Sequence, residues 1–162
     1  MTLCFHHKLF LLQQQYFDLP YIKIILIAVS WAITSAILPL IIAGNQPLSK
    51  FVIAFGWIFF YIIAITIPFD IRDIGIDEDS KKTIPQWVGV KRAKIIAYLC
   101  LMASFIFIVF SLSLLGAISL FISYIIAGFL IKNSSEKRND LYFSFLIDGH
   151  IIFQFLMVYF LC

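Results

Sequence analysis

Uninterrupted apolar runs take up most of this chain, and they limit its fold to one class. The runs lie at residues 21–43, 51–69, 95–131 and 141–161, and each is long enough to cross a hydrocarbon layer of roughly 30 Å as a helix. With 62% hydrophobic residues and a mean hydropathy of +1.01, the chain has more apolar surface than a soluble domain of 162 residues can bury. We therefore expect an all-α, polytopic transmembrane helix bundle that forms a single domain over residues 1–162.

The third run is too long for one helix. At about 1.5 Å per residue, its 37 residues would extend roughly 55 Å. We expect two helices here, at about 93–112 and 115–131, joined by a tight turn near Ser111 to Ala117. The bundle therefore has about five spans, with a short polar connection at 132–140 before the last one.

The basic residues predict how the bundle is oriented. Five spans place eleven Lys and Arg residues on the side of the N-terminus and leave only Lys50 on the other side. Since cytoplasmic segments are enriched in Lys and Arg, we expect the N-terminus and the loop at 70–92 to be cytoplasmic and the C-terminus to be external. The expected location is a bacterial inner membrane. A net charge of +3, with basic residues dispersed between apolar runs, gives no indication of a nucleic-acid partner.

Five of the nine acidic residues gather in ten positions after the second span, at the start of the stretch PFDIRDIGIDEDSKKTIPQWVGVKRAK, residues 68–94. If the second helix continues through this acidic stretch, Asp70, Asp73 and Asp77 lie within about 60° on one helix face. Three carboxylates on one face repel each other unless a cation lies among them. Arg72 is expected to point away from that face, which favours a divalent cation such as Mg²⁺ with hard oxygen ligands and substrate phosphate. The alternative is a solvated loop in which acids and bases neutralise one another.

The same residues resemble a motif of a known family. DIRDIGID, followed by KKTIP, a Gly and a basic pair, is similar to the second aspartate-rich motif of the UbiA-type intramembrane prenyltransferases. In that family nine transmembrane helices surround a lipophilic cavity, and two aspartate-rich motifs hold Mg²⁺ against the diphosphate of a prenyl donor. The prenyl group is transferred to an aromatic or other lipid-building acceptor. The resemblance implies Mg²⁺ ligands at Asp70, Asp73 and Asp77 and diphosphate contacts at Arg72, Lys81 and Lys82.

One part of the family pattern is missing. The first aspartate-rich motif has no counterpart before Asp70. The resemblance thus implies a C-terminal portion that matches helices five to nine, completed by a separately encoded N-terminal half. We expect the chain to be inactive alone, and the alternative function is a non-catalytic, degenerate membrane relative of the family.

The last apolar run, 141–161, contains the polar residues Asp148, His150 and Gln154. Ionisable groups at this depth are costly and usually face the interior of a bundle. Ser144 and Asp148 share one helix face, whereas His150 and Gln154 share another. We expect these residues to form interhelical hydrogen bonds or to line a cavity. A proton or ion pathway, in an ion-coupled transport component, is the third functional interpretation.

Overall fold

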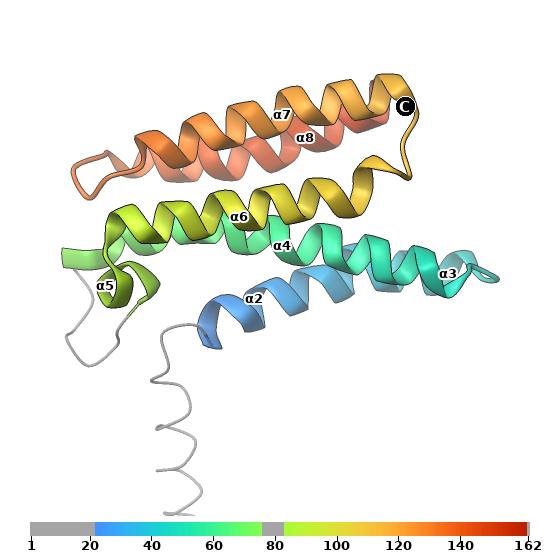
Figure 1. Cartoon of the computed structure of the whole chain (residues 1–162), viewed down its shortest axis with the longest axis horizontal. Helices are drawn as coiled ribbons and strands as arrows, with labels where there is room; N and C mark the ends of the chain where they lie inside the picture. The colour runs from blue at the N-terminus through green and yellow to red at the C-terminus, as the bar shows by residue number, and fades with distance from the viewer. Residues whose placement is uncertain (1–21, 76–82, 162) are drawn as a thin grey trace, which may run out of the picture.

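The structure is a computed structural model, and it describes residues 22–75 and 83–161. All regular secondary structure in these residues is helical (Figure 1). The elements are α2 (Ile22–Ala32), η1 (Ile33–Ile37), α3 (Leu38–Ala43), α4 (Leu48–Arg72), η2 (Asp73–Gly75), α5 (Ile84–Val88), α6 (Val90–Val109), α7 (Leu114–Asn133), η3 (Tyr142–Ile147) and α8 (Asp148–Leu161). The π-helical segments η1 and η3 continue directly into α-helix, so η1 joins α2 to α3 and η3 begins the last helix.

Four of the helices are long and apolar enough to cross a membrane. They extend over Ile22–Ala43, Leu48–Gly75, Val90–Val109 and Leu114–Asn133. A further apolar helix, Tyr142–Met157, is shorter than these four when only residues with described side chains are counted. The predicted all-α class is therefore confirmed for the described residues, and the four long helices indicate an integral membrane protein.

The longest apolar run is divided where the sequence predicted a turn. Helix α6 ends at Val109 and α7 begins at Leu114. Ser113 caps the new helix, because its Oγ accepts a hydrogen bond from the Gly116 N–H at 3.2 Å. Such a cap satisfies one of the backbone donors that have no partner within the first turn of a helix. The expectation of two helices in this run is confirmed.

Helix α4 lies at the centre of the bundle. It packs against α2 and α6, while α7 packs against α6 and α8 (Figure 1). Small side chains let these helices approach each other closely: Ala28 and Ala32 of α2 and Ala93 and Ala97 of α6 are completely buried. Lipid tails are as apolar as the helices, so close van der Waals packing, rather than removal from water, holds helices together in a bilayer.

Two contacts bring polar segments together at one end of the bundle. Lys94 Nζ donates hydrogen bonds of 2.7 Å to the carbonyl oxygens of Lys132 and Ser134. These carbonyl groups lie at the C-terminal end of α7, where the last turn leaves carbonyl oxygens without partners inside the helix and a cation is favourable. Arg72, the last residue of α4, has its Nη1 3.9 Å from Oδ1 of Asp140. The start of the acidic stretch and the polar connection before the last helix therefore lie at the same end, as the predicted five-span arrangement requires.

Candidate functional site

The predicted site begins inside α4 rather than in a loop. The helix passes through Pro68, continues beyond the predicted end at residue 69 and ends at Arg72, after which Asp73 starts the 3₁₀ turn η2. Asp70 therefore lies within the helix, and it is only 3% exposed. Asp77 lies outside the described residues. Since the α-helix ends before Asp73, Asp70 and Asp73 do not lie on one continuous α-helical face.

Arg72 is paired with the residue next to it. Its Nε lies 2.7 Å from Asp73 Oδ1 and its Nη2 lies 3.2 Å from Oδ2, so the two side chains form a bidentate ion pair. The guanidinium carbon also lies 5.4 Å from the ring centroids of Phe69 and Phe143. The expectation that Arg72 points away from the carboxylates was wrong for Asp73, because the chain leaves the α-helix there and the neighbouring side chains come within reach. A divalent cation is thus not needed to neutralise Asp73.

Three carboxylates of the described residues act on Arg72. Besides Asp73, Asp140 approaches its Nη1 at 3.9 Å, and Asp148 acts on it electrostatically from α8. The side chains of Arg72 and Asp73 are 25% and 23% exposed, so a ligand can reach both. The predicted five-span arrangement put the connection with Asp140 on the same side as the acidic stretch, but it gave no sign that Asp140 and Asp148 act on Arg72, because helices α6 and α7 separate them from it along the chain.

Two of the three predicted Mg²⁺ ligands, Asp70 and Asp73, lie among the described residues at this end of the bundle. Asp70 and Asp73 offer carboxylate oxygens, which are the ligands that this hard cation prefers. Within residues 22–75 and 83–161, no group of three His, Cys, Asp or Glu residues could hold a metal ion. The third proposed ligand and two proposed diphosphate contacts lie outside the described residues, namely Asp77, Lys81 and Lys82. Their roles stay predictions.

A short helix, α5, packs against the end of α4. Gln86 connects α5 to η2, which follows α4, because its Nε2 donates a hydrogen bond to the Ile74 carbonyl oxygen at 3.2 Å. Its Oε1 accepts one from the Thr83 N–H at 2.9 Å, at the start of α5. Trp87 is 67% exposed, as is typical of aromatic residues at a membrane interface. We did not expect this helix from the sequence, although Thr followed by Gln three residues later is a common pattern at helix starts.

A separate group of polar residues is buried in the bundle around His150 of α8. The Tyr61 hydroxyl oxygen lies 2.7 Å from His150 Nδ1, while His150 Nε2 lies 2.8 Å from the Ser123 carbonyl oxygen and 3.1 Å from Ser123 Oγ. A carbonyl oxygen can only accept, so Nε2 carries a proton, and in the neutral imidazole Nδ1 then accepts from the Tyr61 hydroxyl. His150 therefore links α4, α7 and α8, and the expected interhelical hydrogen bonding is confirmed for this residue.

A hydrogen-bonded ring lies beside this group. Trp57 Nε1 donates to the Tyr124 hydroxyl oxygen at 3.1 Å, and Ser104 Oγ donates to the Trp57 carbonyl oxygen at 2.8 Å. Because Ser104 has one hydroxyl proton, Tyr124 must donate to Ser104 Oγ across the remaining 2.6 Å contact. Gln154 also reaches the Tyr124 hydroxyl, although its Oε1 is buried without a hydrogen-bond partner among the described residues. Sequence analysis missed Trp57, Ser104 and Tyr124, since such residues are common in apolar helices.

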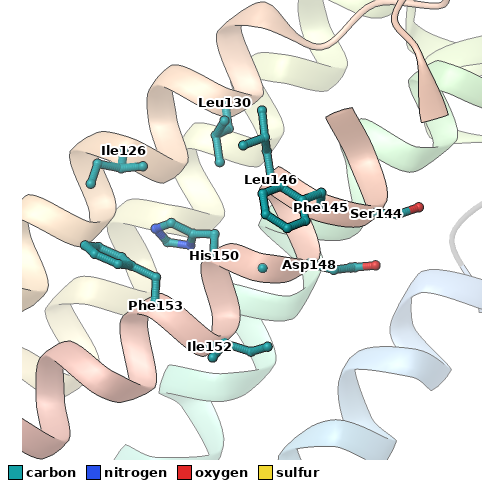
Figure 2. A pocket seen from close by; sticks show the side chains of 10 residues that line it. Ile126, Leu130, Ser144, Phe145, Leu146, Asp148, His150, Ile152 and Phe153 are labelled. Carbon is teal, nitrogen blue, oxygen red and sulfur yellow. The ribbon is translucent and has the colours of Figure 1, made fainter. Parts of the chain in front are cut away.

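The two faces of the last helix differ in burial. His150 and Gln154 are 4% and 5% exposed, whereas Ser144 and Asp148 lie at the surface. Figure 2 shows Ser144 and Asp148 pointing away from His150 and from Ile126 and Leu130 of α7. These residues line the rim of an open cavity of about 580 Å³. The predicted separation of these residues on two helix faces is confirmed. No hydrogen bond joins Asp148 to His150 in the described part of the chain.

No family model, curated protein or solved structure matches this chain. The resemblance to the UbiA-type prenyltransferases therefore depends on the acidic stretch and on the arrangement of the apolar helices.

Proposed function

We propose that this chain is the C-terminal portion of a UbiA-like, Mg²⁺-dependent prenyltransferase of the bacterial inner membrane. Its five apolar helices span the membrane, with the N-terminus and the acidic stretch in the cytoplasm and the C-terminus outside. The donor substrate is a prenyl diphosphate, and the acceptor is an aromatic or other lipophilic compound in the bilayer. One observation carries the proposal: charged residues collect at one end of an otherwise apolar bundle, where Asp70, Arg72 and Asp73 end its central helix.

Asp70, Asp73 and Asp77 would hold Mg²⁺ through their carboxylate oxygens. When bound, Mg²⁺ neutralises the negative charge of the departing diphosphate. Asp70 is positioned by a buried helix, so its carboxylate has little freedom to move. Asp73 would share its oxygens between the cation and Arg72, with which it is now paired.

Arg72 would bind the diphosphate itself. Its planar guanidinium matches phosphate oxygens in geometry and charge, and its packing against both Phe69 and Phe143 limits the directions in which it can donate. Lys81 and Lys82 would add positive charge from the same stretch. The apolar helices would keep water away from the reactive prenyl group, which protects it from hydrolysis.

Two other functions have less support. A non-catalytic relative is favoured by the Arg72–Asp73 pair, because a bidentate ion pair neutralises a carboxylate without any metal. In that case the acidic stretch only ends α4 at the membrane surface. An ion-coupled transport component would need Asp148 and His150 on one path, yet they lie on different faces and His150 already has partners at both ring nitrogens.

An assay of prenyl transfer distinguishes these three functions. With Mg²⁺ and geranyl, farnesyl or geranylgeranyl diphosphate, we expect no transfer by the purified chain alone, because one aspartate-rich motif does not position metal, diphosphate and acceptor together. Co-expression with a separately encoded N-terminal half should restore transfer, and Asp73→Ala or Asp77→Ala should abolish it again. Robust transfer by this chain alone, insensitive to those substitutions, would contradict both the incomplete site and the choice of residues. A stable two-part complex that transfers nothing would favour the non-catalytic relative.

A further inference from the structure

The outward surface of α6 is apolar along most of its length and basic at one end. Its exposed residues are spaced three or four positions apart, so they lie on one face of the helix. From the first turn onward they are Lys91 and Arg92, then Ile95, Leu99, Met102 and Ile106. The apolar part of this face therefore ends in two cations.

Helix α7 has the same pattern in the opposite direction. Its exposed face consists of Leu115, Ile118, Ile122, Ile125 and Phe129 and ends at Lys132, in the last turn. The beginning of α6 and the end of α7 lie at the same end of the bundle (Figure 1), where Lys94 Nζ bonds to the Lys132 carbonyl oxygen. We call the three cations Lys91, Arg92 and Lys132, together with the two apolar faces, the α6–α7 outer face.

An open apolar cavity connects the two helix faces. It has a volume of about 310 Å³, and its lining includes Met102 and Ile106 of α6 and Ile125 of α7. Met102 is ten residues from Arg92, which corresponds to about 15 Å along the helix axis. This distance is about half of a hydrocarbon layer of roughly 30 Å. A lipid with its headgroup at Arg92 therefore has acyl chains that reach the cavity.

The three cations give this face an excess of positive charge. No ion pair joins them to a carboxylate in the described part of the chain. Apart from them and Lys50, near the other end of the bundle, the described residues include five basic and five acidic side chains. The residues outside the described part contain four acids and three lysines, a net charge of −1. Even if all of these lay beside the three cations, they would offset only one positive charge.

We propose that the α6–α7 outer face binds an anionic phospholipid. Lys91, Arg92 and Lys132 hold the headgroup phosphate, while the acyl chains lie along the two apolar faces and in the cavity between them. Basic residues directly beside a membrane helix attract anionic headgroups, and the long stems of Lys and Arg keep the charge at headgroup level while they pack on apolar surface. This inference does not depend on prenyl transfer.

Other occupants fit the α6–α7 outer face less well. A zwitterionic lipid covers the apolar part equally well, but its headgroup carries its own cation and leaves the excess charge without a partner. A second copy in the same membrane orientation, related by a two-fold axis along the membrane normal, would bring two sets of cations together at one depth, and like charges repel. A free phosphate ion has no apolar chain to fill the cavity.

Photo-crosslinking with two lipid probes tests this proposal. The full chain is reconstituted in phosphatidylcholine vesicles with a trace of phosphatidylglycerol or phosphatidylcholine, each carrying the same photoreactive diazirine in one acyl chain. After illumination, labelling is measured on peptides from Val90–Val109 and Leu114–Asn133. We expect at least about fivefold more labelling by the phosphatidylglycerol probe, because one Lys or Arg near an anionic surface contributes about that factor.

Removal of the three cations should abolish this preference. The variant with Lys91→Gln, Arg92→Gln and Lys132→Gln should be labelled equally by the two probes, because its apolar faces are unchanged. Labelling by the phosphatidylcholine probe at the level of the unsubstituted chain would show that the variant is folded and inserted. A preference for phosphatidylglycerol that persists in this variant would contradict the role of the three cations.

A matched variant tests whether position or net charge is responsible. Lys23→Gln, Lys50→Gln and Lys137→Gln together remove the same charge from other exposed positions and should leave the preference unchanged. Loss of the preference in this control would overturn the proposal, and so would equal labelling of the unsubstituted chain by the two probes. If neither probe labelled α6 and α7, a protein chain rather than lipid would cover the face, which also contradicts the proposal.

Discussion

Tyr61 of α4 and His150 of α8 are joined by a 2.7 Å hydrogen bond between the phenol oxygen and Nδ1. His150 also donates to the Ser123 carbonyl oxygen of α7, so one imidazole connects three helices. Hydrogen bonds between membrane helices stabilise modestly, by about 0.6 kcal/mol on average and up to about 2 kcal/mol. The position of α8 in the bundle therefore depends on a polar contact as well as on apolar packing.

Removing the Tyr61 hydroxyl should destabilise the bundle. Tyr61→Phe leaves His150 Nδ1 buried without a donor, and we expect the free energy of unfolding in mixed detergent micelles to fall by about 1 kcal/mol. Thr34→Val is the control, because that exposed hydroxyl bonds to Ser30 within its own helix. An equal loss for both variants would contradict the interhelical role of Tyr61. The role would also be contradicted if His150→Leu lowered the free energy of unfolding as much in the Tyr61→Phe variant as in the unsubstituted chain, since the effects of two residues in contact are not additive.

Lys94 should stabilise the end of α7. Its ammonium donates to two carbonyl oxygens at 2.7 Å, and hydrogen bonds from charged donors are stronger than neutral ones. We expect Lys94→Met to lower the free energy of unfolding by about 1 kcal/mol and to speed amide exchange in the last turn of α7. Lys91→Met, at an exposed position in the same helix, is the matched control. Unchanged exchange in α7 with Lys94→Met would contradict this role.

Gly56 should be required where α4 packs on α6. A Cβ at this position would lie 2.6 Å from Cδ1 and Cε1 of the Phe107 ring. We expect Gly56→Ala to lower the free energy of unfolding by about 1–3 kcal/mol, and Phe107→Leu should recover part of the loss. At Gly128 an added Cβ would have its nearest neighbour at 3.5 Å, in Tyr98, an ordinary contact distance. Gly128→Ala should therefore cost little, and equal losses at the two glycines would show that the Phe107 contact is not responsible.

Much of the fold could be predicted from hydropathy. The apolar runs gave the helices and the divided third run, because crossing a bilayer requires a long stretch without charged groups. The ends of the helices were predicted less well, because the second helix was expected to end at residue 69 but continues through Pro68 to Arg72. A proline removes one backbone donor without necessarily ending a membrane helix. The π-helical segments η1 and η3 had no sequence signal at all.

The candidate site was predicted less well, because contacts depend on how helices rotate and where they end. Helical spacing separated Asp148 from His150 correctly, since both lie in one helix. It failed for Arg72 and Asp73, where the helix ends between them. It also gave no means of pairing Tyr61 with His150, whose contact depends on the relative rotation of α4 and α8.

Reporter fusions test the orientation that the proposed function requires. Fusions after Ser49 and after Cys162 should report an external location, while those after Gln86 and after Ser135 should report a cytoplasmic one, because the proposed five-span arrangement puts eleven of the twelve basic residues on that side. An external signal at Gln86 would contradict the site assignment. Cytosolic prenyl diphosphate could not then reach Asp70, Asp73 and Asp77.

Binding of a prenyl diphosphate tests the proposed site most directly. We expect the purified chain in lipid nanodiscs to bind radiolabelled farnesyl diphosphate saturably and only with Mg²⁺. Asp73→Asn should weaken this binding about tenfold or more, the effect of losing one charged ligand group, while Glu136→Gln should leave it unchanged. Farnesol, which lacks the diphosphate, should show no Mg²⁺-dependent binding. Failure of farnesyl diphosphate to bind, or binding that persists without Mg²⁺ and in Asp73→Asn, would contradict a metal–diphosphate site at the end of α4.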